Sequence, residues 1–271
     1  MNPCLAIVLI DLIVFVGCGN NTSENTQPMA VYNQAYQENF TADSIADIIS
    51  HAKDAYVLID PFADNVHLKV SDIKEKNNQV AGYISVGTGE DWRDDFLALK
   101  QYLTPKVWPQ WEGEFFVSET NTGILPIMKE RINKMSSWGL DWVEFDNMDW
   151  LDDSSRVEFN LTATEEEAKS YINALCSYTH TKGMKCMAKN TVDGFESFDG
   201  VTYESYDNNK NWWDSDDTKR FLAQNKAVII VHYNESDCDS VYTWYKSVYN
   251  SDKISFICED VETEHYKHYN K

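Results

Sequence analysis

The sequence has few positive charges, with 23 Lys and Arg against 44 Asp and Glu, so its net charge is −21. A nucleic-acid-binding protein needs a positive surface that displaces counterions, and this balance argues against such a partner. It suits a cationic or neutral partner, or a surface that serves only solubility. The apolar run near the N-terminus is short and weakly flanked, so we do not interpret it as a membrane span.

Metal and cofactor signatures are also scarce. No CxxC pair occurs, and no GxGxxG follows the first predicted strand, so we predict no metal and no cofactor. The polar C-terminal tail contains His265 and His268, which we interpret as solvated surface rather than as a ligand pair.

The composition is that of a globular protein, with 43% hydrophobic and 25% charged residues in 271. One large domain of this length is ordinary, and we expect a monomer. The first 18 residues have the form of a signal peptide, in which Phe15 to Cys18 resemble a bacterial lipobox. Two departures are the lack of Lys or Arg in the n-region and Asp11 within the apolar run. We therefore predict an exported protein with a signal peptide (1–18), a polar linker (19–30) and a catalytic domain (31–271), anchored through a lipid on Cys18 or free.

Four cysteines remain once the leader is set aside. An exported chain permits disulfides, and four cysteines allow three pairings. Cys238 and Cys258 lie near the last two predicted strands, and Cys176 and Cys186 lie on a helix and the strand it feeds. We predict that Cys238 and Cys258 are close enough to bond, and Cys176 and Cys186 form the second possible pair, while the sequence leaves the connectivity open.

From about residue 55 the chain repeats one pattern, a short β-branched or aromatic run followed by an amphipathic segment. The candidate strands are residues 55–60, 80–87, 114–119, 141–147, 185–190, 200–206, 227–234 and 254–260. One connection, residues 191–199, is too short for a full helix. Strands that alternate with helices predict a parallel sheet, and eight units predict a (β/α)8 TIM-type barrel. An open doubly wound sheet is the alternative.

In such a barrel the active site lies at the carboxyl ends of the strands. The residues there are Asp60, Ser85, Glu119, Asp146 with Asn147, Lys189 with Asn190, Glu204, His232 and Glu259 with Asp260. In the run DWVEFDN, alternation directs Val143 and Phe145 towards the helices, and Trp142, Glu144 and Asp146 towards the barrel axis. The same parity in GVTYESY directs Glu204 inwards.

Two carboxylates that face each other across a pocket are the equipment of glycoside hydrolysis. Asp146 is our candidate nucleophile, with Asn147 and Lys189 near enough to stabilise its charge. Glu204, between two tyrosines, is our candidate general acid and base because its surroundings look drier. Glu144 lies one layer deeper, where it can simply pair with Lys189.

Nine tryptophans are many for this length, and several fall in predicted loops. Each alone is more often packing than a sugar platform. The adjacent Trp212 and Trp213 lie in an acidic loop, so their ring faces and the surrounding carboxylates suit an amino sugar.

Several motifs recur in the order of a known family. They are YISVGTGEDWRDDF, the W-x-GE of WEGEFFVS, the IMKERI helix, GLDWVEFDNMDW, the Lys-Asn pair of the fifth strand, and YESY. From about Tyr56 to Glu204 the chain thus resembles glycoside hydrolase family 114, the endo-α-1,4-polygalactosaminidase group. The resemblance implies a (β/α)8 fold and cleavage of α-1,4-linked galactosamine polymers.

The resemblance also implies site residues. The catalytic carboxylates of the family fall on Asp146 and Glu204, and other polar positions of its pocket fall on Asp60, Tyr83, Glu144, Asn147, Asp149 and Asn190. With Lys189, Trp212 and Trp213 these form the predicted substrate-binding set. Two departures, Tyr206 in place of a small residue or Cys and the bulky Met148 to Trp150, concern the shape of the sugar subsites.

Two other kinds of protein fit parts of the sequence. A non-catalytic sugar-binding barrel would keep the aromatic platforms without needing both acids, and a structural surface lipoprotein would keep only the fold. The presence of both carboxylates favours the enzyme.

Overall fold

The computed structural model describes residues 28–36, 42–108, 111–118, 120, 123–148, 150, 158–206, 209–249, 253–260 and 265–270. The predicted signal peptide and most of the linker lie outside these ranges. Within them no helix is both long and apolar enough to cross a bilayer.

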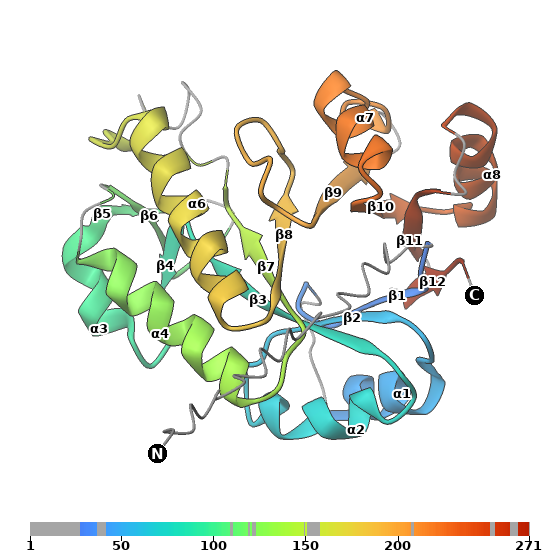
Figure 1. Cartoon of the computed structure of the whole chain (residues 1–271), viewed down its shortest axis with the longest axis horizontal. Coiled ribbons are helices and arrows are strands. Elements are labelled where there is room, and N and C mark those ends of the chain that lie inside the picture. The colour runs from blue at the N-terminus through green and yellow to red at the C-terminus, as the bar shows by residue number, and fades with distance from the viewer. Residues whose placement is uncertain are drawn as a thin grey trace, which may run out of the picture.

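The strands of the described chain form one large curved sheet of nine strands and one small sheet of three (Figure 1). In spatial order the large sheet contains β1 (Val31–Asn33), β2 (Tyr56–Ile59), β3 (Gln79–Ser85), β7 (Trp142–Asp146), β8 (Lys185–Lys189), β9 (Gly200–Tyr206), β10 (Ala227–Glu235), β11 (Ser255–Asp260) and β12 (His265–His268). The first eight run parallel, and β12 is antiparallel to β11. This nearly closed sheet confirms the predicted barrel.

Helices cover the outside of the barrel (Figure 1). They are α1 (Ala42–His51), η1 (Val66–Lys69), α2 (Val70–Lys74), α3 (Phe96–Leu99), η2 (Lys100–Tyr102), α4 (Ile124–Ser137), α6 (Glu165–Thr181), α7 (Asp216–Ala223) and α8 (Cys238–Val248). Thr164 and Glu167 form a reciprocal capping box at the start of helix α6, whose first turn also contains Glu165 and Glu166. Residues 191–199 contain no helix, again as predicted.

The assignment of two strands differs from the prediction. The run at 114–119 does contain a strand, β6 (Glu114–Val117), but it lies in the small antiparallel sheet with β4 (Thr88–Glu90) and β5 (Leu103–Val107). Strand β3 pairs directly with β7 instead. The first barrel strand is β1, three residues that are too short to carry a readable pattern. We call β4, β5 and β6 the side sheet.

The C-terminal tail is the second correction. Strand β12 extends the barrel sheet beyond β11, and His268 meets β1, where its Nδ1 lies 2.6 Å from the Val31 carbonyl oxygen and its ring stacks on Tyr32. The tail therefore helps to close the barrel rather than forming solvated surface.

Side chains alternate across the barrel wall as the strand period requires. The interior contains Val31, Tyr56, Leu58, Ala81, Trp142, Met187, Ala227, Ile229, Val231 and Ile257. Val143 and Phe145 belong instead to the layer between sheet and helices, which confirms the predicted parity of β7. Both predicted disulfides are present, with Cα separations of 5.7 Å for Cys176–Cys186 and 5.8 Å for Cys238–Cys258.

Candidate active site

The polar centre of the molecule lies at the carboxyl ends of three neighbouring parallel strands. Asp146 ends β7, Lys189 ends β8 and Glu204 lies near the end of β9. The strands are adjacent, so three residues that are distant in the sequence meet at one point of the rim.

Lys189 lies between the two candidate catalytic carboxylates. Its Nζ is 3.1 Å from Oδ1 of Asp146 and 3.3 Å from Oε1 of Glu204, and it lies 3.9 Å from the ring centroid of Tyr36. Because both oxygens lie within 3.3 Å of one nitrogen, they are less than twice that distance apart. The lysine side chain is only 2% exposed, so its charge is balanced by these acids rather than by water.

Glu204 accepts hydrogen bonds from three directions. Besides Lys189, Asn190 Nδ2 donates to its Oε2 at 2.9 Å and the Tyr233 hydroxyl donates to its Oε1 at 3.1 Å. Burial raises the pKa of Glu204, but the charge of Lys189 and these hydrogen bonds outweigh it, and the pKa lies below its usual value. Glu204 is also more exposed than Asp146, at 29% against 19% of the side chain, contrary to the drier surroundings expected from its tyrosine neighbours.

Glu144 lies deeper, inside the barrel, and is fully buried. Tyr36 donates to its Oε1, and Tyr56 and Thr202 each donate to its Oε2 at 3.0 Å. The hydroxyls are thus its direct partners, whereas Lys189 bonds the two acids above it. Burial raises the pKa of Glu144 to about 8, despite the nearby positive charge.

This raised pKa predicts a pH-dependent stability. The unfolded chain releases the Glu144 proton near its ordinary pKa, while the folded protein holds it up to about pH 8. The folded state then binds more protons between these values, so the free energy of unfolding is expected to fall as pH rises from about 5 to 8. Denaturant titrations should show a shallower fall in Glu144→Gln, and an equal slope in both proteins would contradict this explanation.

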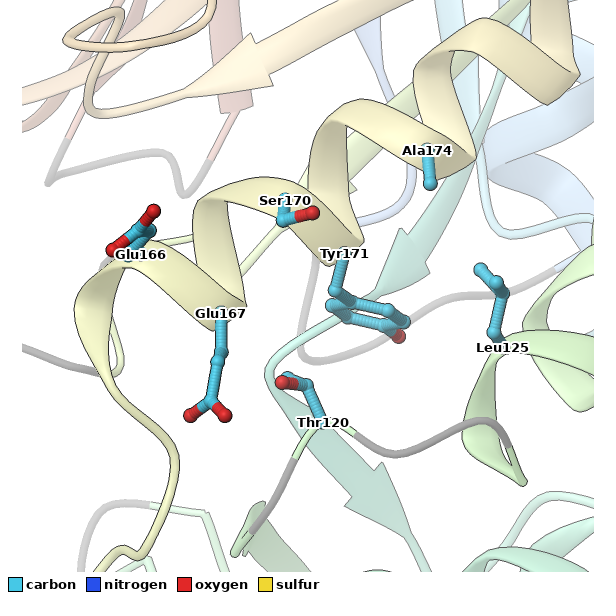
Figure 2. Close-up of a pocket in the computed structure, with 7 residues that line it drawn as sticks. All are labelled: Thr120, Leu125, Glu166, Glu167, Ser170, Tyr171 and Ala174. Atoms are coloured by element: carbon cyan, nitrogen blue, oxygen red, sulfur yellow. The ribbon is translucent and has the colours of Figure 1, made fainter.

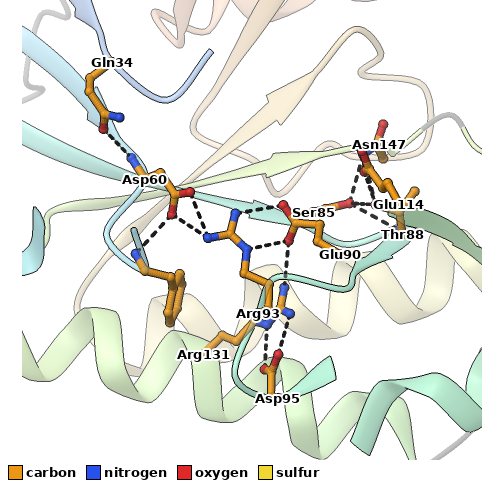
Figure 3. Close-up of polar contacts among 11 residues, drawn as sticks. Gln34, Asp60, Ser85, Thr88, Glu90, Arg93, Asp95, Glu114, Arg131 and Asn147 are labelled. Atoms are coloured by element: carbon orange, nitrogen blue, oxygen red, sulfur yellow. Dashed lines mark hydrogen bonds and ion pairs between the residues drawn. The ribbon is translucent and has the colours of Figure 1, made fainter. Parts of the chain in front are cut away.

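A second polar network joins the barrel rim to the side sheet (Figure 3). Arg93 donates to both carboxylate oxygens of Asp60 at 2.8 Å and to both of Glu90 at 2.8 Å. Arg131 on α4 reaches Glu90 at 3.6 Å and Asp95 at 2.7 Å. Asp60, a predicted substrate-binding residue, is therefore fully engaged by Arg93, which the sequence had not marked for a role.

Asn147 is also turned towards the protein. Its Nδ2 lies 2.9 Å from Ser85 Oγ and 3.0 Å from Glu114 Oε1. Its φ of 55° lies in the left-handed region, where Asn is tolerated better than most residues. Tyr83 stands beside this network, and burial, followed by the charges of Asp146 and Glu90, raises its pKa well above the usual value.

The two adjacent tryptophans differ. Trp212 is 39% exposed, and its Nε1 donates to the Glu204 carbonyl at 2.9 Å, which places it at the edge of the site. Trp213 is 2% exposed, and its ring packs against Tyr203, Tyr245 and Tyr249. Contrary to the expectation, Trp213 supports the loop from below and offers no face to a sugar.

The parity of β10 also corrects the predicted rim. His232 faces the outer layer beside Tyr245 and Phe256, and the residue that points into the site is Tyr233. Strict alternation counted from the interior residues Ile229 and Val231 would have identified it. Of the predicted rim and site residues, Glu119 and Asp149 lie outside the described residues.

A surface pocket of about 380 Å³ lies between α4 and α6, away from this centre (Figure 2). It is lined by Thr120, Leu125, Glu166, Glu167, Ser170, Tyr171 and Ala174. It contains none of the residues predicted for the site.

One group in the described chain has metal-ligand spacing, Cys176, His180 and Cys186, with ligand atoms within 4.8 Å of one another. Its two sulfurs are bonded to each other and so are not thiolates.

Comparison with known proteins places the chain in context. The model of glycoside-hydrolase family GH114 matches residues 21–271. The structure of Aspergillus fumigatus Ega3 in complex with galactosamine is similar, with a TM-score of 0.69, 20% identity, and coverage of 90% of this chain and 95% of that one. The glycoside hydrolase domain of PelA from Pseudomonas aeruginosa follows, with a TM-score of 0.64, 14% identity, and coverage of 88% and 97%.

A more distant likeness is the GH20 β-N-acetylhexosaminidase from Streptomyces coelicolor A3(2), with a TM-score of 0.51, 7% identity, and coverage of 76% of this chain and 48% of that one. At these identities the structures establish a shared barrel fold. No curated protein sequence matches the chain.

Proposed function

We propose that this protein, which belongs to glycoside-hydrolase family GH114 and is thus a glycosidase, is endo-acting and cleaves internal bonds of α-1,4-linked galactosamine polymers. Asp146 and Glu204 are the catalytic pair in this proposal. The observation that carries this proposal is the arrangement of both carboxylates around Lys189 at the mouth of the barrel. The galactosamine bound to the similar Ega3 structure supports the choice of sugar.

The spacing of the acids supports a two-step reaction. Their nearest oxygens are at most 6.4 Å apart, because they lie 3.1 and 3.3 Å from the same Lys189 Nζ. Retaining glycosidases keep their carboxyl groups about 5–5.5 Å apart, whereas inverting ones leave room for water at about 6.5–9.5 Å. In the first step Asp146 bonds to the anomeric carbon as the glycosidic bond breaks and Glu204 protonates the departing oxygen. In the second, water gives a proton to Glu204 and replaces Asp146.

The donor role sets an expected pH dependence. Glu204 must carry a proton to act as the acid, yet Lys189, Asn190 and Tyr233 keep it ionised in the free protein. A sugar that covers the carboxylate raises its pKa by removing water. We expect kcat/KM to be highest in acidic solution and to decline as pH rises, since the protonated fraction declines. A profile that stays high through neutral pH would instead assign Glu204 the nucleophile role.

We also expect a preference for polymer with free amines. The net charge is −21, and a cationic chain would be steered towards an acidic protein, by about tenfold or more in association rate at low salt. The local acids contribute less than their number suggests, because Asp60 pairs with Arg93, Asp214 with Lys219, and Asp217 with Arg220. Initial rates on deacetylated polymer should fall with salt, since screening is strong beyond about 8 Å, while rates on fully N-acetylated polymer should not. Equal, salt-independent rates would refute the steering.

The experiment that tests the proposed function is the release of reducing ends from purified polygalactosamine. An enzyme generates them with a rapid loss of chain length, and proton NMR of the first product reports whether the α configuration is retained. Binding without release would favour the non-catalytic sugar-binding barrel, and neither would favour a structural lipoprotein. We also propose that the protein is exported through its N-terminal leader and acts as a monomer. Mass spectrometry of the mature protein tests whether Cys18 carries a lipid.

A further inference from the structure

Glu114 is a buried acid that comes from the side sheet rather than from the barrel. It lies on β6, where it pairs with Glu90 of β4 in the antiparallel register. Its residue exposure is only 5%, and its Oε1 accepts hydrogen bonds from the Thr88 hydroxyl and from Asn147 Nδ2. The carboxylate thus enters the polar cluster at the barrel mouth (Figure 3).

The partner of Glu114 is the residue that follows Asp146. Asn147 has a left-handed backbone with φ of 55°, a conformation that Asn tolerates better than most residues. Its side-chain amide contacts Ser85, Thr88 and Glu114, at 2.9, 3.3 and 3.0 Å. The carbonyl of Asp146 in turn accepts from Val86 N at 3.0 Å. The turn that carries Asp146 is therefore fixed from both sides.

The position of Glu114 is itself fixed by the ion pairs of the side sheet. Arg93 joins Glu90 to Asp60 on the barrel, and Arg131 joins Glu90 to helix α4. The backbone between β3 and β4 lies close to Asn147, because a Cβ on Gly87 would lie 2.1 Å from the Asn147 carbonyl oxygen. The side sheet therefore holds Glu114 in a fixed position relative to the barrel rim.

We infer that Glu114 is a positioning residue for Asp146, acting through its hydrogen bond to Asn147. This inference rests on the proposed catalytic role of Asp146. Glu114 does not contact the sugar in this assignment. Its contribution is to hold the nucleophile in line with the anomeric carbon, where a displacement of about 1 Å can cost about 10²-fold in rate.

The protonation state of Glu114 indicates which side chain can replace it. The groups that face it are Glu90 with its partner Arg93 on the side sheet, Tyr83 on β3, and Asp146 on β7. Burial, together with the charges of Glu90 and Asp146, raises the pKa of Glu114 to about 7, although the hydrogen bonds from Thr88 and Asn147 lower it. In mildly acidic solution the side chain is therefore neutral, and Gln reproduces its size, its charge and its accepting oxygen.

The test compares Glu114→Asp, Glu114→Gln and Asn147→Ala with a control, Glu112→Gln. Glu112 is an exposed acid in the turn that precedes β6. Asp is one methylene too short to reach Asn147, so kcat on polygalactosamine is expected to fall at least tenfold with KM within about twofold. Gln is expected to keep kcat within about threefold of wild type. Wild-type kcat in Glu114→Asp, or a loss that appears only in KM, would overturn the inference.

A double variant separates positioning from general destabilisation. If Glu114 acts through Asn147, then Glu114→Asp combined with Asn147→Ala has the kcat of Asn147→Ala alone. Losses that multiply would overturn the inference, and the single Asn147 variant probes the same contact if Glu114→Asp does not fold. Inactive wild type, or full activity in Asp146→Asn, would refute the proposed function itself. An inactive Asp146→Asn beside a fully active Glu114→Asp would refute only the positioning role.

Discussion

Asp146→Asn and Glu204→Gln are each expected to lower turnover by about 10²–10⁴-fold while the fold stays intact. Both substitutions keep the size of the side chain and remove the charge or proton that the reaction needs. Lys189 retains one carboxylate partner in either variant, so the buried cation is not left alone. The measurement is kcat on polygalactosamine, with circular dichroism and galactosamine binding as checks on the fold and the pocket.

Matched controls exist for both changes. Asp54→Asn and Glu75→Gln alter exposed acids in the segments that precede β2 and β3, at the end of these strands opposite the rim, and are expected to retain wild-type kcat. If either catalytic variant also kept wild-type turnover, that residue would leave the mechanism. If Glu204→Gln kept activity only towards substrates with good leaving groups, Glu204 would be confirmed as the acid, since such leaving groups need no proton.

Of these substitutions, Lys189→Met is expected to lower the free energy of unfolding the most. Lys189 balances Asp146 and Glu204 and lies near Glu144, so its loss leaves three acids in one buried space. Removing one partner of a buried ion pair costs about 3–5 kcal/mol. Activity should fall as well, because Asp146 loses the hydrogen bond that Lys189 Nζ donates to its Oδ1 at 3.1 Å.

The sign of the pH dependence distinguishes this explanation from simple loss of packing. Without the cation, the folded protein holds protons on its carboxyls at higher pH than the wild type does. The stability deficit is therefore expected to be smaller at pH 5 than at pH 8, as measured by denaturant titration. A deficit that is equal at both values would point to packing alone. Lys182→Met, at an exposed position near the end of α6, is the control.

The sequence by itself determined the repeating architecture and the inward direction of the candidate carboxylates. Strand periods of two directed Glu144, Asp146 and Glu204 inwards, and the structure places them there, because alternation along a strand is a local property. The two candidate disulfide pairs came from the positions of the cysteines on the predicted helices and strands, and both are present. The family resemblance came from the same short motifs and is confirmed over residues 21–271.

Only the tertiary structure decided which strand belongs to which sheet. The run at Glu114 has the pattern of a strand, but strand patterns do not name their partners, and β6 pairs with β4 rather than with a barrel strand. The short β1 pairs with β2, and the polar β12 turns back onto β11 while His268 reaches the Val31 carbonyl oxygen of β1. Their hydrogen bonds, not their composition, make them strands.

The partners of each ionisable group were likewise set by packing. Sequence suggested that Lys189 pairs with Glu144, yet the lysine bonds Asp146 and Glu204, while three hydroxyls satisfy Glu144. Trp213 looked like a platform, yet its ring packs against Tyr203 of β9 and against Tyr245 and Tyr249 of helix α8 and its C-cap. Burial and pairing depend on side chains that meet only when the barrel closes, so pKa values and contact faces could not be read from neighbours in the chain.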